Sequence, residues 1–213
     1  MSAQDYTLYG APGWGSVLAE AMLARCGVPF TVVDVQGFDA EGPARQRLLA
    51  LNPLGQIPTL VLPDGAVMTE SAAIALLLAE RHPDAGLAPP PDAPERAAFL
   101  RLLVWMVANV YPTFTYGDYP ERWVKESPGD LGASAVAHRK TLWLWLESQM
   151  GGGPWVLGER FSALDIYVGA MVHWRPRRDW FAEHCPNLSG VAGRVLALPT
   201  LVPVWHRNFG GAP

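Results

Sequence analysis

The order of strand-like and helix-like segments in the first part of the chain constrains the fold most. An apolar run at 6–10 leads through a Gly/Pro-rich turn into an amphipathic helical stretch at 16–25, and the β-branched run Phe30–Val35 follows. A strand, a helix and a second strand in this order form a parallel βαβ unit. We therefore expect a sheet whose first two strands run parallel.

The next segment reverses the chain direction. After a helical stretch at 43–51, two short β-favouring runs, Ile57–Leu62 and Ala66–Thr69, flank the residues Pro-Asp-Gly. Such residues favour the tight turn of a hairpin. A further helix begins near Glu70 and ends before Pro83. The predicted order is β-α-β-α-β-β-α, a mixed sheet covered by helices.

The pattern after this point is helical. The proline-rich segment Pro83–Arg96 has few large apolar side chains and predicts an interdomain linker. Helical periodicity follows at 96–110, 133–150, 162–174 and 188–198. We therefore predict a first domain at 1–83, a linker at 84–95 and an all-helical domain at 96–213.

Composition excludes several classes of function. The 213 residues are half hydrophobic and carry a formal charge of −4, which indicates a compact globular protein and argues against nucleic acid or an anionic membrane surface as partner. The N-terminus lacks a signal-peptide pattern, and the longest apolar run, Leu102–Tyr111, is about half a membrane span. The basic segment Trp174–Trp180 is expected to be a solvated helix end, with anion or partner binding as the alternative. We expect a cytoplasmic protein.

The sequence does not predict metal or thiol chemistry of the chain's own. Cys26 and Cys185 lie far apart and form neither a CxxC pair nor a disulfide framework. The five histidines are scattered without metal-ligand spacing. A thioredoxin-type redox protein is a weak alternative, because that chemistry needs a cysteine in the first turn. We expect no metal site.

Three motifs carry a resemblance to a known family. They are NPLGQIPTL at Asn52–Leu60, ESAAI at Glu70–Ile74, and GERFSALDI at Gly158–Ile166, where Ser162 and Asp165 predict a helix capping box. Together with the order of elements, they make the chain resemble the cytosolic glutathione transferases over essentially its whole length. The resemblance implies a thioredoxin-like first domain, an all-α second domain, glutathione as co-substrate and a homodimer.

The resemblance places a glutathione site on the first domain. Pro58 matches the family's cis proline, which would turn the backbone of Ile57 toward an extended peptide; an ordinary edge-strand proline is the alternative. Gln56 is a candidate donor to the glycine end of the ligand. Glu70 and Ser71 match a clamp for the γ-glutamyl head, in which Glu70 takes the ammonium and Ser71 the carboxylate, although such a pair also caps ordinary helices.

The group that activates the thiol is harder to assign. Family members use a Tyr at the end of the first strand or a Ser or Cys in the turn, and here those Tyr and Cys positions fall on Gly10 and Gly15. Tyr9 is one residue out of register and is predicted to lie in the core. Ser16 is therefore the candidate catalytic residue, with a plain helix N-cap as the alternative. Trp14 either lines the glutathione site or simply packs against neighbouring residues.

The second substrate would be an apolar electrophile. Tyr111, Tyr116 and Trp123 are candidates to line its pocket, or they belong to the core. The leading prediction is a glutathione transferase of the detoxifying type, which stabilises the glutathione thiolate for attack on a small electrophile, or uses it for peroxide or disulfide reduction or for isomerisation. The alternative is a non-catalytic binding or regulatory module of the same fold.

Overall fold

The computed structural model describes residues 5–210, so the ends of the predicted domains 1–83 and 96–213 lie outside the described residues. The elements are, in chain order, β1 (Tyr6–Gly10), α1 (Ser16–Cys26), β2 (Phe30–Asp34), α2 (Pro43–Leu49), β3 (Thr59–Val61), β4 (Val67–Met68), α3 (Ser71–Arg81), η1 (Pro83–Ala85), α4 (Arg96–Trp105), η2 (Met106–Val110), α5 (Tyr111–Asp118), η3 (Pro120–Arg122), α6 (Pro128–Ser148), α7 (Ala163–Met171), α8 (Arg178–His184), α9 (Pro186–Leu196) and α10 (Val202–Phe209). The predicted β-α-β-α-β-β-α order and the helical second half are confirmed.

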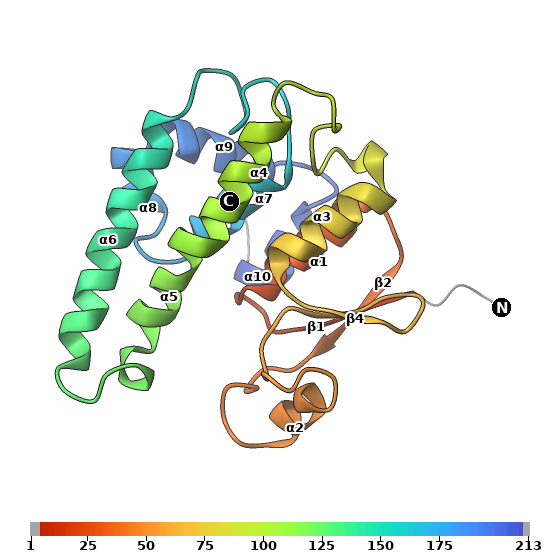
Figure 1. The fold of residues 1–213 in the computed structure, drawn as a ribbon, viewed down its shortest axis with the longest axis vertical. Coiled ribbons are helices and arrows are strands. Elements are labelled where there is room, and N and C mark those ends of the chain that lie inside the picture. Colours follow the sequence, from red (N-terminus) through yellow and green to blue (C-terminus); the bar gives the residue numbers. More distant parts are fainter. Residues whose placement is uncertain (1–4, 211–213) are drawn as a thin grey trace. The chain divides into compact units, whose positions relative to one another are not determined.

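The strands form one mixed sheet in the order β2-β1-β3-β4. β1 pairs with β2 in parallel, whereas β3 is antiparallel to both β1 and β4. Helices α1 and α3 cover one face of the sheet and α2 lies on the other (Figure 1). This arrangement is a thioredoxin-like domain.

Apolar side chains fill both faces of this sheet. On the α1 face, Val17, Leu18 and Met22 are fully buried, and each contributes about 1.5–3 kcal/mol by leaving water. On the α2 face, a smaller cluster contains Val35, Phe38 and Leu48 together with Ala11. Both faces of the central strand β1 are therefore covered.

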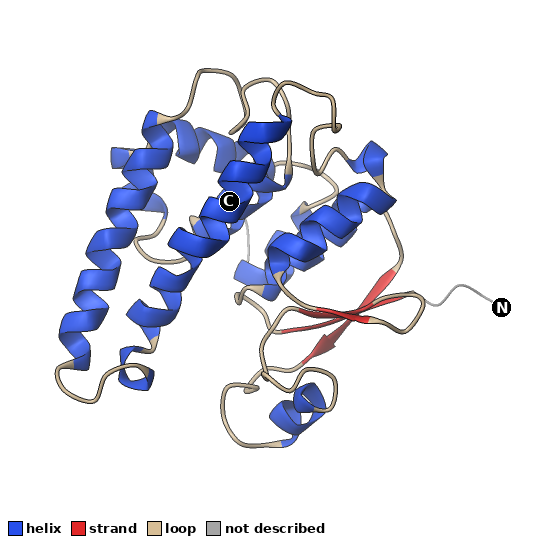
Figure 2. Cartoon of the chain, viewed as in Figure 1, coloured by secondary structure: helices blue, strands red, loops and turns tan. Residues whose placement is uncertain are grey.

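The second half of the chain is helical throughout its regular structure (Figure 2). The helix predicted at 96–110 continues to Asp118, because a π-helical segment, Met106–Val110, comes just before Pro112. The N–H of Tyr111 bonds to the carbonyl of Met106 at this wider turn, so the helix accommodates a proline that donates no hydrogen bond. By length and composition alone the 23-residue segment Arg96–Asp118 could cross a membrane, whereas here it packs along α6.

The capping box is present as predicted. Ser162 Oγ accepts a hydrogen bond from the N–H of Leu164, while Asp165 accepts from the N–H of Ser162 at 2.7 Å and from that of Val156 at 2.8 Å. Asp165 is fully buried. The motif therefore fixes both the start of α7 and the loop before it.

The domain limits differ from the predicted ones. One compact unit holds the chain up to Ala88 together with the segment from Val195 onward, and the other is Pro89–Arg194. Helix α10, which the sequence analysis does not predict, therefore belongs with the sheet-containing unit. The predicted linker at 84–95 is divided between the two units. Helix α8 is also unpredicted and begins inside the basic segment Trp174–Trp180.

Candidate functional site

Three strand ends meet at one edge of the sheet, namely the edge that runs across the ends of the strands and not along an outer strand. Because β3 is antiparallel to both neighbours, the end of β1, the start of β3 and the end of β4 lie together. The observed pairs end at Tyr9 with Thr59 and at Leu60 with Met68, and the same registers continued to Ile57 lead toward Ala11 on one side and Ser71 on the other. Ile57 also packs against the cluster that contains Ala11. The predicted glutathione-binding residues before β3 and after β4 are thus brought together.

The backbone of Ile57 is unpaired at this edge. The Ile57–Pro58 peptide bond is cis, as the resemblance implies, and Pro58 is buried. Within the described residues, no hydrogen bond reaches the N–H or C=O of Ile57. The preceding carbonyl, of Gln56, accepts instead from Asn52 Nδ2 at 3.0 Å and from Thr59 Oγ1 at 2.8 Å. The Gln56 side chain is exposed. The edge therefore offers one donor and one acceptor to an extended segment.

Glu70 adopts a backbone conformation that a non-glycine residue rarely takes. Its φ is 62° and its ψ is 107°, a conformation that costs about 1–3 kcal/mol and persists where the surrounding structure imposes it. The side chain is exposed, and its carboxylate has no ion pair or hydrogen bond with any residue in the described range. Ser71 follows as the first residue of α3 and is half-buried. A free anion thus stands beside a helix N-terminus.

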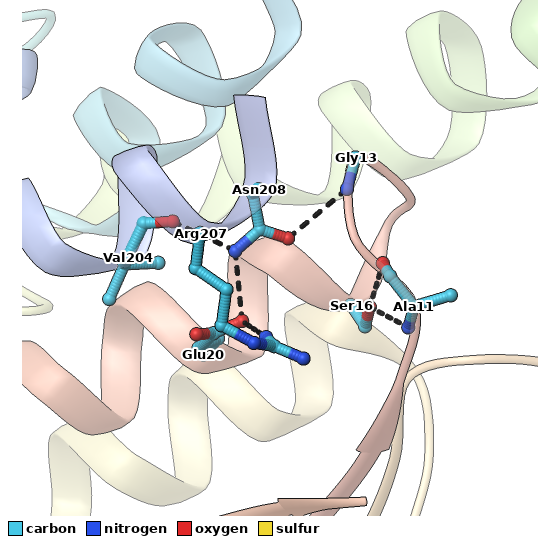
Figure 3. Close-up of polar contacts among 7 residues, drawn as sticks. All are labelled: Ala11, Gly13, Ser16, Glu20, Val204, Arg207 and Asn208. Carbon is cyan, nitrogen blue, oxygen red and sulfur yellow. Dashed lines mark hydrogen bonds and ion pairs between the residues drawn. The ribbon is translucent and has the colours of Figure 1, made fainter. Parts of the chain in front are cut away.

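Ser16 closes the turn between β1 and α1. Its side chain is 2% exposed. Its Oγ accepts a hydrogen bond from the N–H of Ala11 at 3.0 Å and donates one to the Ala11 carbonyl at 3.1 Å (Figure 3). The N-cap of α1 is Gly15, without a side-chain cap. This geometry supports neither the thiol-activating role nor the N-cap alternative, because the hydroxyl is already committed to Ala11.

Backbone donors remain available at the same turn. Neither Gly15 nor Ser16 has a hydrogen-bond partner for its N–H among residues 5–210. These two groups belong to the first turn of an 11-residue helix, where unpaired amides and the helix dipole favour an anion.

The position expected for a tyrosine is closed by Ser16. A Cβ built on Gly10 would lie 2.6 Å from both Cβ and Oγ of Ser16, closer than real atoms approach. Tyr9 is half-buried and packs on the cluster around Ala11, on the opposite face, as predicted. Trp14 packs on the same cluster, with its ring 4.9 Å from that of Phe38. The packing alternative for Trp14 is therefore the one that the structure supports.

The predicted electrophile-pocket residues form two aromatic groups in the helical unit. Tyr116 and Trp123 are exposed, and their rings lie 4.9 Å apart. Tyr111 is half-buried, with its ring 6.1 Å from that of Trp174. A groove of about 560 Å³ in this unit is lined by other residues, namely Gly117, Pro120, Gly129, Gly132, Ala133, Val136, Ala137, Lys140 and Arg175. That Tyr111, Tyr116 and Trp123 line a substrate pocket stays a prediction.

Burial disfavours the thiolate form of both cysteines. Burial raises the pKa of Cys26 to about 11 and that of Cys185 to about 12. Both are free thiols. Across the described part of the chain, no three His, Cys, Asp or Glu side chains are grouped to hold a metal. The thiol chemistry of a thioredoxin-type protein has no support here.

One residue that the sequence analysis misses lies next to the turn. Asn208 on α10 accepts a hydrogen bond from the N–H of Gly13 through its Oδ1 at 3.2 Å (Figure 3). It shares the buried face of α10 with Val204 and Trp205. A polar residue at the last position of a 201, 204, 205, 208 helical repeat is the signal that could have marked it.

The contact between Gly10 and Ser16 generates a prediction. Gly10→Ala should lower the free energy of unfolding by roughly 1–3 kcal/mol, because its methyl group has no room beside Ser16. Adding Ser16→Gly should recover part of that loss, because both clashing atoms are removed. Chemical denaturation of the single and double variants measures the coupling. Purely additive losses would contradict the packing described.

Comparisons with known proteins agree with this architecture. The family model "Glutathione S-transferase, N-terminal domain" matches residues 19–81. The chain is 48% identical to the GST-like protein YncG of Escherichia coli K12, over 94% of this chain and 97% of the relative. It is 26% identical to glutathione S-transferase GstA of Escherichia coli O157:H7, over 78% and 81%. A Sulfitobacter glutathione transferase homolog, solved with bound glutathione, has a TM-score of 0.83 at 26% identity, over 94% and 96%. The chain belongs to the glutathione S-transferase family.

Proposed function

We propose that this chain binds reduced glutathione along the edge formed by β1, β3 and β4 and stabilises its thiolate. The thiolate would attack a small apolar electrophile; reduction of a peroxide or disulfide, or isomerisation, would start from the same species. The Sulfitobacter homolog and a sphingomonad glutathione S-transferase were both solved with glutathione, at TM-scores of 0.83 and 0.77. The observation that carries the proposal is that, among the described residues, neither the backbone of Ile57 nor the carboxylate of Glu70 has a partner.

Each part of the tripeptide has a matching group at this edge. The cysteinyl backbone would pair with the N–H and C=O of Ile57 as an added strand does. The ammonium of the γ-glutamyl head would meet the Glu70 carboxylate, and its carboxylate the hydroxyl and N–H of Ser71 at the start of α3. Gln56 would donate to the glycine carboxylate. A ligand with charges of both signs at one end fits this set.

Thiolate formation is within reach of backbone donors. A thiol with a pKa near 8.5 is only a few per cent ionised at neutral pH, and lowering that pKa by one to two units requires about 1.4–2.7 kcal/mol. A hydrogen bond to a charged group contributes roughly 1.5–3 kcal/mol, and a helix N-terminus adds about 0.3–1 kcal/mol. The amides of Gly15 and Ser16 would therefore suffice without the Ser16 hydroxyl. The thiol proton would pass to solvent.

A second candidate function is a glutathione-binding module without turnover. One observation favours it: the Ser16 hydroxyl at the start of α1 is buried and hydrogen-bonded to Ala11. Binding without a lowered thiol pKa would support this candidate over the transferase.

The Glu70 clamp can be tested by calorimetry. Glu70→Ala should weaken glutathione binding tenfold or more, about 1.4 kcal/mol, because the ammonium loses its partner. Glu80→Ala is the matched control, since Glu80 is another exposed carboxylate on α3. Equal affinity in both variants, or no binding by the native protein at millimolar glutathione, would refute the proposed site.

A variant of Ser16 distinguishes activation of the thiol by backbone amides from activation by the serine hydroxyl. Ser16→Ala should leave the pKa of the bound glutathione thiol unchanged, while the free energy of unfolding falls by about 1–3 kcal/mol because Ala11 loses two hydrogen bonds. Ultraviolet absorbance of the thiolate against pH gives the first quantity and urea denaturation the second. A thiol pKa raised by about one unit would return Ser16 to the catalytic role.

The chain is further proposed to work in the cytoplasm as a homodimer. Leu100 and Val104 are exposed one turn apart on α4, Leu144 is exposed on α6, and the rings of Trp105 and Trp145 join these helices at 4.5 Å. An apolar face of this kind favours association. Light scattering should give twice the 23.2 kDa of one chain. Val104→Glu should yield a monomer, whereas Val202→Glu, at an exposed position of α10, should not.

A further inference from the structure

A buried polar network joins α10 to α1 and to the turn that precedes it (Figure 3). Glu20 on α1 is 4% exposed, and its Oε2 accepts hydrogen bonds from Arg207 Nη1 at 2.5 Å and from Asn208 Nδ2 at 2.9 Å. Asn208 Oδ1 in turn accepts from the N–H of Gly13 at 3.2 Å. A single side-chain amide therefore connects a buried carboxylate to the turn.

The orientation of the Asn208 amide is fixed by its neighbours. Besides Glu20, the carbonyl of Val204 accepts from Asn208 Nδ2 at 2.9 Å. Both hydrogens of the amide nitrogen are thus used, and the oxygen is left to face Gly13. Burial raises the pKa of Glu20, while the bond from Asn208 and the charge of Arg207 act in the opposite direction. Glu20 is thus the acceptor that holds the amide in place.

The turn is anchored at two points. The Ser16 hydroxyl is hydrogen-bonded to Ala11, where the turn begins, and Asn208 is hydrogen-bonded to Gly13, within the turn. Gly13 has a φ of 79°, and a Cβ there would lie 3.4 Å from the Asn208 carbonyl oxygen, so the turn approaches α10 closely. The amides of Gly15 and Ser16, which have no partner within residues 5–210, follow the anchored Gly13 after one intervening residue, Trp14. Their direction therefore depends on it.

We propose that Asn208 is a positioning residue for the thiolate site, held in its working orientation by Glu20. Through Gly13 it keeps the turn in the conformation that aims the first amides of α1 at the glutathione sulfur. This inference rests on the proposed function. It predicts a separation of effects: the thiol pKa depends on Asn208, whereas the affinity for glutathione, set by Ile57 and Glu70 at the sheet edge, depends on it little.

The test compares variants on one helix. Asn208→Ala should raise the pKa of the bound thiol by about half a unit or more, with glutathione affinity within about threefold of wild type. Trp205→Phe is the matched control: it removes the 3.3 Å bond from Trp205 Nε1 to the Val195 carbonyl and leaves Gly13 untouched. It should destabilise α10 without changing the thiol pKa.

The role of Glu20 is tested by a double-mutant cycle. Glu20→Ala should shift the thiol pKa in the same direction, and Glu20→Ala combined with Asn208→Ala should add nothing, because both act through one bond to Gly13. Glu20→Gln retains an oxygen acceptor for Asn208 and should stay near wild type. Additive shifts from the two alanine substitutions would overturn the assigned role of Glu20.

If a variant does not fold, a measurement on the wild-type protein still tests the inference. The amide of Gly13 should exchange its hydrogen slowly, because Asn208 holds it; exchange at the rate of a free amide would overturn the inference. So would a thiol pKa that shifts equally in Asn208→Ala and Trp205→Phe. Absence of glutathione binding by wild type would instead refute the proposed function, and this inference with it, even if Gly13 is protected.

Discussion

The antiparallel pairing of β3 with both β1 and β4 is the constraint on which the rest of the site depends. A strand placed in this way brings the end of one neighbour, its own start and the end of the other neighbour to a single edge. No hydrogen bond within residues 5–210 reaches the backbone of Ile57 at this edge, and Glu70 follows β4 in a conformation that the surrounding structure imposes. The groups proposed to bind glutathione, before β3 and after β4, are thereby brought to one edge of the sheet by backbone pairing.

The turn before α1 has no space for a side chain at Gly10, the position expected for a tyrosine. Gly10 lies against Ser16, Ser16 is bonded to Ala11, and Gly13 is bonded to Asn208 of α10. The groups of this turn that are proposed to stabilise a thiolate are its backbone amides. A rigid turn suits this role, because amides that are already aligned need no reorganisation when charge develops near them. In this account the anchors on either side of the amides take the place of a catalytic hydroxyl.

Much of this architecture could be predicted from local sequence. Strand and helix order and the capping box at Ser162 follow from periodicity and short motifs, while the open edge around Pro58 is what the family resemblance implies. The role of Ser16 could not, because its hydrogen-bond partner is set by the tertiary path of the turn. Helix α10 is short and carries Pro203 near its start, and Pro112 obscured a helix that a π-segment carries onward. The missed features are those in which a polar or proline residue is satisfied by long-range or irregular contacts.

The central claim is that backbone groups at the sheet edge and at the start of α1 hold glutathione. Titration of isotope-labelled protein with reduced glutathione, followed through the amide chemical shifts, tests it most directly. Saturable changes should be largest at Ile57, Ser71, Gly15 and Ser16. Saturable changes that are largest elsewhere in the chain, with these four amides unmoved, would contradict it.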